Sequence, residues 1–500
     1  MIRRWQRPIV GIVGALILST ATLATMSWTE PPRFDGAGYA TLGRAIAEGR
    51  GYRDISRPDA PRHTHFPPGY PGFLALIWKP AGTDHPERFT TLAHAASIGC
   101  MAIGVWSVGR WWFATEPSQV AACLTLALAV NWTWVRTGGV IRSEPLAIAL
   151  GGLTLVLARR VSKAQAWSVG MVGLTLVMGV GILTRQVFVC WACALILDLG
   201  LRRGRSLALW LSAGVVVLAA PWVGWQVRVG SGSQSGLFRR DELSTLIPNQ
   251  ALFYARRIPD AVAGPFIEVA TVFGRTSWLA ALATAVGVVA TSVVLLGWVR
   301  LGRTPRRRLG GLIPLLTLPL LLAWPFTEAG RFLVPLVPFI LMGAVEGGAF
   351  LFDRWDVDRP KLWAARMVLA LSIPYSAYAV VSNRAQAERS TQRDFDSACS
   401  WLASQTAPEG PVMARHPGDA AWLSGRLAVE IPEGGVSKVI EAIRRDRVAF
   451  LILDEDRYAR SPDNPLRSII NQSGRFRKVW GGGTTSIYQV ETSSIDTLHP

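Results

Sequence analysis

The sequence is 500 residues long, half of it hydrophobic, and its mean hydropathy is +0.28. Only 17% of the residues are charged, below the roughly 25% that is usual for soluble domains. The apolar residues come in blocks of roughly 16–23, the length that crosses the hydrocarbon of a bilayer. These features exclude an ordinary soluble protein and indicate an integral membrane protein with many spans.

The net charge of +18 and the isoelectric point near 10.6 do not indicate nucleic-acid binding. Arginine and lysine occur in short clusters between the apolar blocks, and not along one face of a soluble domain. This distribution follows the positive-inside rule and suits the anionic headgroups of a membrane. The clusters lie at residues 3–7, 110, 159–163, 202–205, 300–308 and 354–361.

Taking these clusters as cytoplasmic predicts about eleven membrane spans within 1–383. The N-terminal apolar run resembles a signal peptide, but no persuasive cleavage site follows it. We therefore interpret it as a retained first span with a cytoplasmic N-terminus. Outer loops are expected at about 30–86 and 228–274. The first four spans are expected at about 8–28, 89–109, 118–135 and 145–158. Two further spans form a hairpin around 184–186, and the seventh lies at about 207–227. Three more spans follow up to the cluster at 354–361, and the last lies at about 362–381.

The composition after Asn383 is that of a soluble domain, which the odd number of spans places outside the cytoplasm. Helices are expected at 392–405 and 436–447, and strands at 411–414, 448–454 and 485–491. The apolar run 448–454 is typical of a buried strand. The predicted fold class is therefore a mostly α, polytopic helical membrane protein with a C-terminal soluble α/β domain over 384–500.

The first outer loop contains Asp35, directly before a segment with an amphipathic helical pattern at 40–49. Two interpretations are open for this carboxylate. It can cap the helix by accepting backbone N–H bonds, or it can act as a general base at the membrane face. Loops of this kind concentrate function in membrane proteins.

Three short outer turns are expected to bring further charges to the same side of the membrane. They contain Arg142 with Glu144, then Arg185, then Glu328 with Arg331. Ionisable groups at such positions are costly unless they are paired or used. Arginines there can bind phosphate oxygens in bidentate fashion. They can also simply reach toward lipid headgroups, and Arg142 and Glu144 can pair with each other.

Four segments in this order resemble motifs of the GT-C glycosyltransferases that use polyprenyl-phosphate sugars. Relatives within that group include the protein O-mannosyltransferases (glycosyltransferase family 39), the lipid A aminoarabinose transferases and the Rgt-like transferases. The segments are Asp35 with EGRGY at 48–52, HFPPGYP at 65–71, RSEPL at 142–146 and GRFLVPLVP at 330–338.

The resemblance implies an inverting transfer of a sugar from a lipid phosphate to an extracytoplasmic hydroxyl. It implies catalytic roles for Asp35, as the base, and for Glu144, which would position the acceptor or a cation. It implies an acceptor that is lipid, glycan or protein, and no nucleic acid. Several relatives carry two adjacent acids where this chain has Asp35-Gly36, so a divalent metal stays an open alternative. The residues expected to bind substrate are Arg142, Arg185, Arg331, His65, Tyr70 and Glu328.

Two other functions compete with a transferase. A transporter or flippase of lipid-linked sugars would also carry charges along its path. Transporters often have repeats and broken helices in the middle of the membrane, whereas the ionisable residues of this sequence gather at the outer edge, which favours a transferase. A non-catalytic assembly or sensor protein would present the C-terminal domain to a partner. For that domain we expect acceptor binding or gating, and no separate active site, because it lacks a glycine-rich phosphate loop. The two cysteines of the CxxC at 190–193 are expected to pack within a span.

Overall fold

We describe the protein from a computed structural model, which places residues 2–161, 168–230, 243–273, 278–382, 393–406, 409–432, 436–454, 470 and 476–491. The described residues form two compact units. The first unit draws on Met1–Met26, Pro67–Tyr70 and His94–Asn383, and it is a helical bundle. The second draws on Ser27–Phe66, Pro71–Ala93 and Arg384–Pro500. The second unit therefore combines most of the first outer loop with the C-terminal segment.

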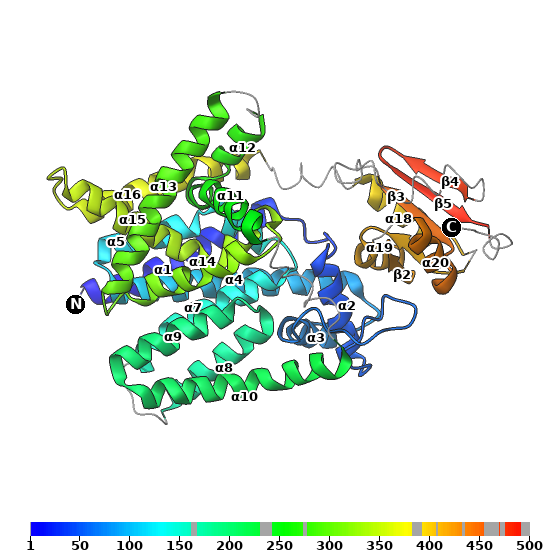
Figure 1. Ribbon diagram of the computed structural model, residues 1–500, viewed down its shortest axis with the longest axis horizontal. Coiled ribbons are helices and arrows are strands. Elements are labelled where there is room, and N and C mark those ends of the chain that lie inside the picture. The colour runs from blue at the N-terminus through cyan, green and yellow to red at the C-terminus, as the bar shows by residue number, and fades with distance from the viewer. Residues whose placement is uncertain are drawn as a thin grey trace. The chain divides into compact units, whose positions relative to one another are not determined.

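Helices make up almost all of the first unit (Figure 1). A helix occurs at each expected span, and the third span is a pair of helices with a bend of 51° between them. The helices are α1 (Ile2–Thr25), α4 (Pro86–Thr115), α5 (Ser118–Ala129), α6 (Trp132–Gly138), α7 (Ser143–Val161), α8 (Val169–Thr184), α9 (Phe188–Arg203), α10 (Arg205–Val229), α11 (Leu243–Ala263), α12 (Phe266–Phe273), α13 (Trp278–Arg303), α14 (Leu309–Ala323), the 3-10 helix η2 (Glu328–Leu336), α15 (Val337–Asp353) and α16 (Pro360–Val381).

Within the described residues, six helical segments are long and apolar enough to cross a membrane, and the bent pair α5–α6 is a seventh. Helices α8 and α14 are apolar but shorter. The protein is thus an integral membrane protein, as the sequence predicts. The total of about eleven crossings and the orientation of the two termini stay predictions.

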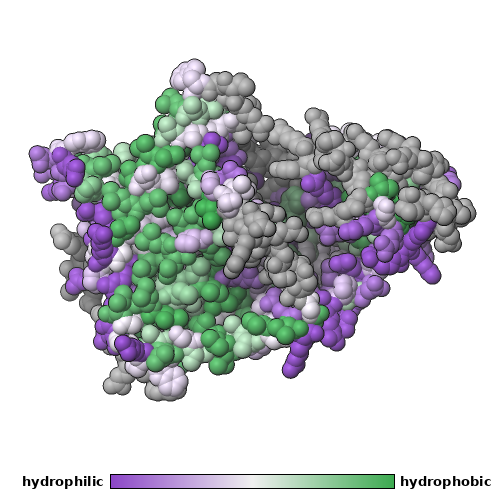
Figure 2. All heavy atoms as spheres, viewed as in Figure 1, coloured by the Kyte–Doolittle hydropathy of each residue, from purple (hydrophilic) through white to green (hydrophobic). Residues whose placement is uncertain are grey.

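The surface of the bundle is apolar, as lipid contact requires. Figure 2 shows a broad hydrophobic area over the helices, with hydrophilic residues gathered at its edge. On α10, for example, Val216, Val217 and Val227 are 65%, 69% and 77% exposed. An outward apolar surface of this extent would be unfavourable in water, and it matches the hydrocarbon of a bilayer.

Small residues allow α13 and α15 to pack closely. A Cβ atom on Gly297 would collide with the backbone of Gly343, and one on Gly347 would collide with the carbonyl oxygen of Val293. Lipid gives no hydrophobic driving force between helices, so membrane helices associate through close backbone approach at small residues. These glycines explain why α13 and α15 form a tight pair.

Buried ion pairs join the helix ends that carry the basic clusters. Lys361 Nζ lies 2.6 Å from Glu116 Oε2 and 2.9 Å from Glu346 Oε2. Arg307 Nη1 lies 2.6 Å from the same oxygen of Glu346. The Glu116 side chain is only 1% exposed, so its charge depends on these partners. This network holds the start of α16 to the end of α4 and to the middle of α15.

The second expected outer loop is largely helical where the structure describes it, because α11 and α12 fill it. Asp260 in α11 accepts hydrogen bonds from the backbone N–H groups of Ile267 and Glu268, both at 2.9 Å. It therefore caps the start of α12. Two prolines inside α11, Pro248 and Pro259, weaken its helical pattern in the sequence.

The second unit contains a mixed five-stranded sheet in the order β2-β1-β3-β5-β4 (Figure 1). Strand β1 is parallel to β2 and β3, whereas β5 is antiparallel to β3 and β4. The strands are β1 (Val412–Ala414), β2 (Ala428–Glu430), β3 (Phe450–Asp454), β4 (Phe476–Gly482) and β5 (Thr485–Val490), and the helices are α2 (Asp35–Ala47), α3 (Gly69–Ala81), α18 (Arg393–Ser404), α19 (Pro417–Ser424) and α20 (Val436–Asp446).

Strand β3 is buried on both faces, which explains its unbroken apolar sequence. Leu451 and Leu453 belong to a core that also contains Ile443 of α20. Phe450 and Ile452 belong to a second core with Leu402 of α18. The expected helices and strands of this region are confirmed as α18, α20, β1, β3 and β5. Helix α19 and strands β2 and β4 were not expected.

The first outer loop packs against α19 within this unit. The rings of Trp78 and Phe89 stack 4.0 Å apart, and Trp422 of α19 lies 5.8 Å from each of them. The Ala428 N–H donates to the carbonyl oxygen of Ser56 at 2.8 Å. These contacts bury aromatic surface between segments that lie far apart in the sequence. A division of the chain near residue 383 stays a prediction.

Candidate active site

Glu144 lies at the start of α7 in the first unit, and it is 2% exposed. Arg185 Nη1 lies 2.7 Å from Glu144 Oε1, and Arg331 Nε donates to the same oxygen. The Arg185 guanidinium also donates to Ser143 Oγ at 3.2 Å. A buried carboxylate needs such partners because burial without them is strongly unfavourable. Glu144 therefore joins three segments of the sequence, namely the start of α7, the end of α8 and η2.

Arg185 comes from the end of a helix and Arg331 from within one. Arg185 is the residue that ends α8, where the backbone becomes extended. Arg331 lies in η2, the short 3-10 helix before α15. Their side chains are only 13% and 14% exposed, so they are not simply reaching toward headgroups in solvent. The sequence predicts that these residues share one side of the membrane, and the structure brings them into contact with Glu144.

Three guanidinium groups act on the Glu144 carboxylate. Arg142, which is partly buried, adds a third guanidinium whose charge acts on this carboxylate. One acid with three arginines leaves an excess of two positive charges, counted from these four residues. Among the described residues, Glu144 Oε2 has no hydrogen-bond partner. The cluster can thus bind an anion, and Oε2 can accept a hydrogen bond from a hydroxyl group.

Gly69 of the HFPPGYP segment lies against the end of α8. A Cβ atom on Gly69 would lie 2.6 Å from the carbonyl carbon of Leu183 and 2.8 Å from the backbone nitrogen of Thr184. Only glycine at position 69 permits this close approach to the backbone of Leu183, which lies two residues before Arg185. The next residue, Tyr70, is 2% exposed and is part of the core. Its burial favours a packing role over direct contact with a bulky substrate.

Helix α11 brings further charges near η2, and the sequence did not point to them. Arg257 pairs with Glu268, and its guanidinium lies 5.1 Å from the centre of the Phe253 ring. A Cβ atom on Gly330 would lie 3.9 Å from the Arg257 side chain. Arg257 is therefore a neighbour of the turn that supplies Arg331. The hydrophobic pattern around 243–263 gives no sign that Arg257 would lie next to this turn.

Asp35 is the first residue of α2 in the second unit, and it is partly exposed. The residue before it, Phe34, has φ 52° and ψ −125°. Residues other than glycine rarely adopt this conformation, which costs about 1–3 kcal/mol and persists only where its surroundings hold it. Gly36 N–H donates to the carbonyl oxygen of Arg33 at 2.8 Å, so the helix begins with a tight turn.

His65 is exposed, and its ring lies 4.8 Å from that of Phe66. His63, two residues earlier, accepts a hydrogen bond from the Phe66 N–H through Nε2 at 2.8 Å. Burial lowers the pKa of His63 to about 4, so its ring is neutral at physiological pH. His63 orders this part of the loop, and His65 stays the predicted substrate contact.

The backbone of Glu328 begins η2, but its side chain lies outside the described part of the structure. Within the described residues, no three His, Cys, Asp or Glu side chains lie close enough together to hold a metal ion. The carboxylate of Glu144 is bound by arginines, which repel a cation. The residues around Glu144 thus fit an anion and do not fit a divalent metal.

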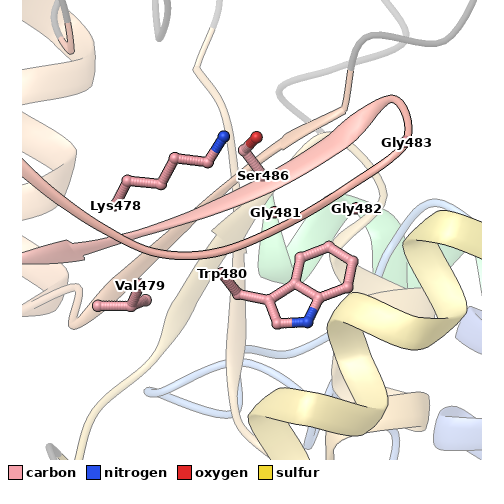
Figure 3. Close-up of a pocket in the computed structure, with 7 residues that line it drawn as sticks. All are labelled: Lys478, Val479, Trp480, Gly481, Gly482, Gly483 and Ser486. Carbon is pink, nitrogen blue, oxygen red and sulfur yellow. The ribbon is translucent and has the colours of Figure 1, made fainter.

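A recess of about 500 Å³ lies at the β4–β5 hairpin (Figure 3). Lys478 and Ser486 lie on one side of the hairpin and Trp480 on the other, following the irregular register between Lys478 and Trp480. The residues that line it include three glycines, one cation and one hydroxyl group. No acidic residue is among them, so the lining supplies no base for transfer chemistry.

No family model matches the sequence, and the search of curated proteins found no match. Solved structures, in contrast, match over most of the chain. The oligosaccharyltransferase AglB of Archaeoglobus fulgidus, in complex with an inhibitory peptide and a dolichol-phosphate, has a TM-score of 0.57 at 12% identity, over 99% of this chain and 75% of that one. The same archaeon's oligosaccharyltransferase with zinc and sulfate has a TM-score of 0.58 at 12% identity, over 89% and 68%.

ArnT from Cupriavidus metallidurans bound to undecaprenyl phosphate matches over 97% of this chain and 98% of that one, with a TM-score of 0.50 at 15% identity. These similarities extend through both units, and the matched proteins are polytopic membrane glycosyltransferases. Identities this low establish the fold and no more. The chain has the GT-C fold of membrane glycosyltransferases.

Proposed function

We propose that the protein is a membrane glycosyltransferase that moves a sugar from a polyprenyl-phosphate donor to an extracytoplasmic hydroxyl group. The observation that carries this proposal is the buried cluster of Glu144 with Arg185 and Arg331 in a GT-C fold. Guanidinium groups that converge on one position suit a phosphate group.

The arginines bind the phosphate of the donor and stabilise it as it leaves. Negative charge accumulates on that phosphate while the glycosidic C–O bond breaks, so fixed cations lower the barrier most at that stage. A lipid phosphate is already a stable anion, and it needs no strong general acid. Arg185 and Arg331 are held by Glu144 before the donor binds, which reduces the cost of organising the site.

Asp35 acts as the general base on the acceptor. The acceptor O–H proton passes to the Asp35 carboxylate while the hydroxyl oxygen attacks the anomeric carbon. The bond from that carbon to the phosphate oxygen breaks, and its electron pair stays on the phosphate. Attack from the face opposite the leaving group inverts the anomeric centre. The partial exposure of Asp35 leaves it accessible to an incoming hydroxyl.

Glu144 has two tasks in this mechanism. Its Oε1 orients the two guanidinium groups. Its Oε2 accepts a hydrogen bond from a hydroxyl group of the acceptor, in line with the expectation from the sequence that Glu144 positions the acceptor or a cation. His65 and Glu328 are retained as proposed substrate contacts, and Arg142 as a weaker one. A divalent metal is not assigned to any of these residues.

The donor and acceptor classes follow from the ligands named for proteins of the same fold. Those ligands are a dolichol-phosphate with an inhibitory peptide in AglB, and undecaprenyl phosphate in ArnT. We infer a polyprenyl-phosphate sugar as donor and a lipid, glycan or protein hydroxyl as acceptor. We also propose that the N-terminus is cytoplasmic and that the C-terminal domain faces the opposite side of the membrane, where the acceptor is.

The experiment compares the cell-envelope glycans of matched strains with and without this protein by mass spectrometry. We expect one sugar to disappear from one class of acceptor when the protein is lost, and to return with the wild-type chain. The purified protein should then transfer that sugar from a polyprenyl-phosphate donor in liposomes. Unchanged envelope glycans, with movement of the intact lipid-linked sugar across the bilayer, would instead support a flippase.

A further inference from the structure

Two acidic side chains of the C-terminal domain bind the residues directly before Asp35. Asp419 Oδ1 accepts a hydrogen bond from the Phe34 N–H at 2.6 Å. Asp396 Oδ2 lies 2.5 Å from Arg33 Nη2. These contacts join positions 385 and 363 residues apart in the sequence. Both pairs belong to the second unit, in which the loop and the C-terminal segment pack together.

The Phe34 backbone is in a conformation that needs such support. Its φ of 52° lies in the region that favours glycine, and it is the residue from which α2 starts. Without an external partner, a phenylalanine would relax to negative φ and change the direction in which the chain enters the helix. Asp419 is itself 4% exposed, so its hydrogen bond to Phe34 is shielded from water.

Other contacts hold α19 against α2. They keep Asp419 in place, so that it would not move with Phe34 if the Phe34 backbone changed conformation. A Cβ atom on Gly418 would lie 3.4 Å from the Ala37 side chain. The ring of His416 lies 5.0 Å from that of Phe34 in an edge-to-face arrangement. Trp422, one turn further along α19, packs against Trp78 of α3. The acceptor oxygen of Asp419 is therefore fixed with respect to α2.

We propose that Asp419 is a positioning residue for the base, because it fixes the backbone of Phe34 and thereby the direction of the Asp35 carboxylate. This inference rests on the proposed role of Asp35. Asp396 supports the same segment through Arg33. The C-terminal domain then contributes to the transfer step itself, in addition to any part in acceptor binding.

The first test measures kcat and the donor KM of purified Asp419→Ala and Asp419→Asn variants in liposomes. For Asp419→Ala we expect kcat to fall about 10- to 100-fold with KM nearly unchanged, since a misdirected base affects the transition state and not donor binding. Asparagine keeps an oxygen acceptor, so Asp419→Asn should recover most of kcat. The matched control is Asp394→Ala, which removes a carboxylate that accepts the Thr484 N–H at 2.9 Å in the same domain. Its kcat should equal that of wild type.

The second test is a double-mutant cycle with Phe34→Gly. Glycine adopts positive φ without strain, so Asp419→Ala should cost much less in the Phe34→Gly background than in wild type. An equal loss in both backgrounds would mean that Asp419 does not act through Phe34, and would overturn the proposal. If melting curves show that Asp419→Ala is unfolded, Asp396→Ala provides a second test, because it removes the partner of Arg33 in the same segment. An unchanged kcat for Asp396→Ala would then overturn the proposal.

The two proposals fail in different ways. If Asp35→Asn turns over like wild type, Asp35 is not the base and the proposed mechanism fails, whatever Asp419 does. If Asp35→Asn is inactive while folded Asp419→Ala keeps wild-type kcat, the proposed mechanism stands and the positioning role is wrong.

Discussion

Substitution of Glu144 by glutamine tests whether the arginine cluster is an anion site. Glutamine has nearly the same shape, but it removes the negative charge that Glu144 presents to Arg185 and Arg331. Glu144 is 2% exposed, so the loss resembles the removal of one member of a buried ion pair, which costs about 3–5 kcal/mol of stability. A bound phosphate can replace the missing negative charge. We therefore expect undecaprenyl phosphate to restore much of the lost stability.

The assay is the thermal unfolding of the purified protein in detergent, with and without undecaprenyl phosphate. A ligand at 100 times its Kd raises the free energy of unfolding by about 2.7 kcal/mol. Tighter binding to the variant raises it further. The control is Asp198→Asn. Asp198 is paired with Arg202 at 2.8 Å and Arg308 at 3.6 Å, and its side chain is 6% exposed. We expect no larger response to the ligand in that variant than in wild type. A Glu144→Gln variant whose response equals that of Asp198→Asn would refute the anion-site reasoning.

The remaining predictions concern the loop and the topology. Gly69→Ala should greatly reduce transfer, because the added Cβ would lie 2.6 Å from the Leu183 backbone, whereas Gly72→Ala, where the space is open, should be silent in the same turnover assay. The pKa of His63 is lowered from 6.5 to about 4, so its neutral form stabilises the folded loop above pH 6.5, and this stabilisation is lost as pH falls from 6.5 toward 4. Hydrogen-exchange protection factors around Phe66 should decrease over that interval in wild type but not in His63→Gln, and identical behaviour would exclude His63 as the cause. A reporter fused after Pro500 should be active only outside the cytoplasm, and cytoplasmic activity would overturn the odd number of spans.

The sequence predicts those features that arise from local patterns. Apolar runs and basic clusters locate the helices, because burial in lipid demands continuous apolar segments and a helical backbone. The run at 448–454 predicts β3, because burial on both faces removes the polar alternation. The sequence predicts an outer loop at about 228–274 but not the helices α11 and α12 within it, because the prolines of α11 hide its pattern. Strand β2 was missed because it is only three residues long.

The candidate site was only partly predictable. The sequence assigns Glu144, Arg185 and Arg331 to one side of the membrane, and it leaves open whether Glu144 pairs with Arg142. The ion pairs of Glu144 with Arg185 and Arg331 arise from the packing of distant segments, which no local spacing encodes. Asp419 had no signal at all, because its partner is a backbone N–H group in a distant segment.

The most direct test of the proposed chemistry is the turnover of purified Asp35→Asn in liposomes with a polyprenyl-phosphate sugar and its acceptor. Asparagine preserves shape and hydrogen bonding but cannot take the acceptor proton. We predict a correctly folded, membrane-inserted variant with glycosyl transfer reduced by at least about 100-fold, as expected for loss of a general base. Wild-type turnover in this variant would contradict the account.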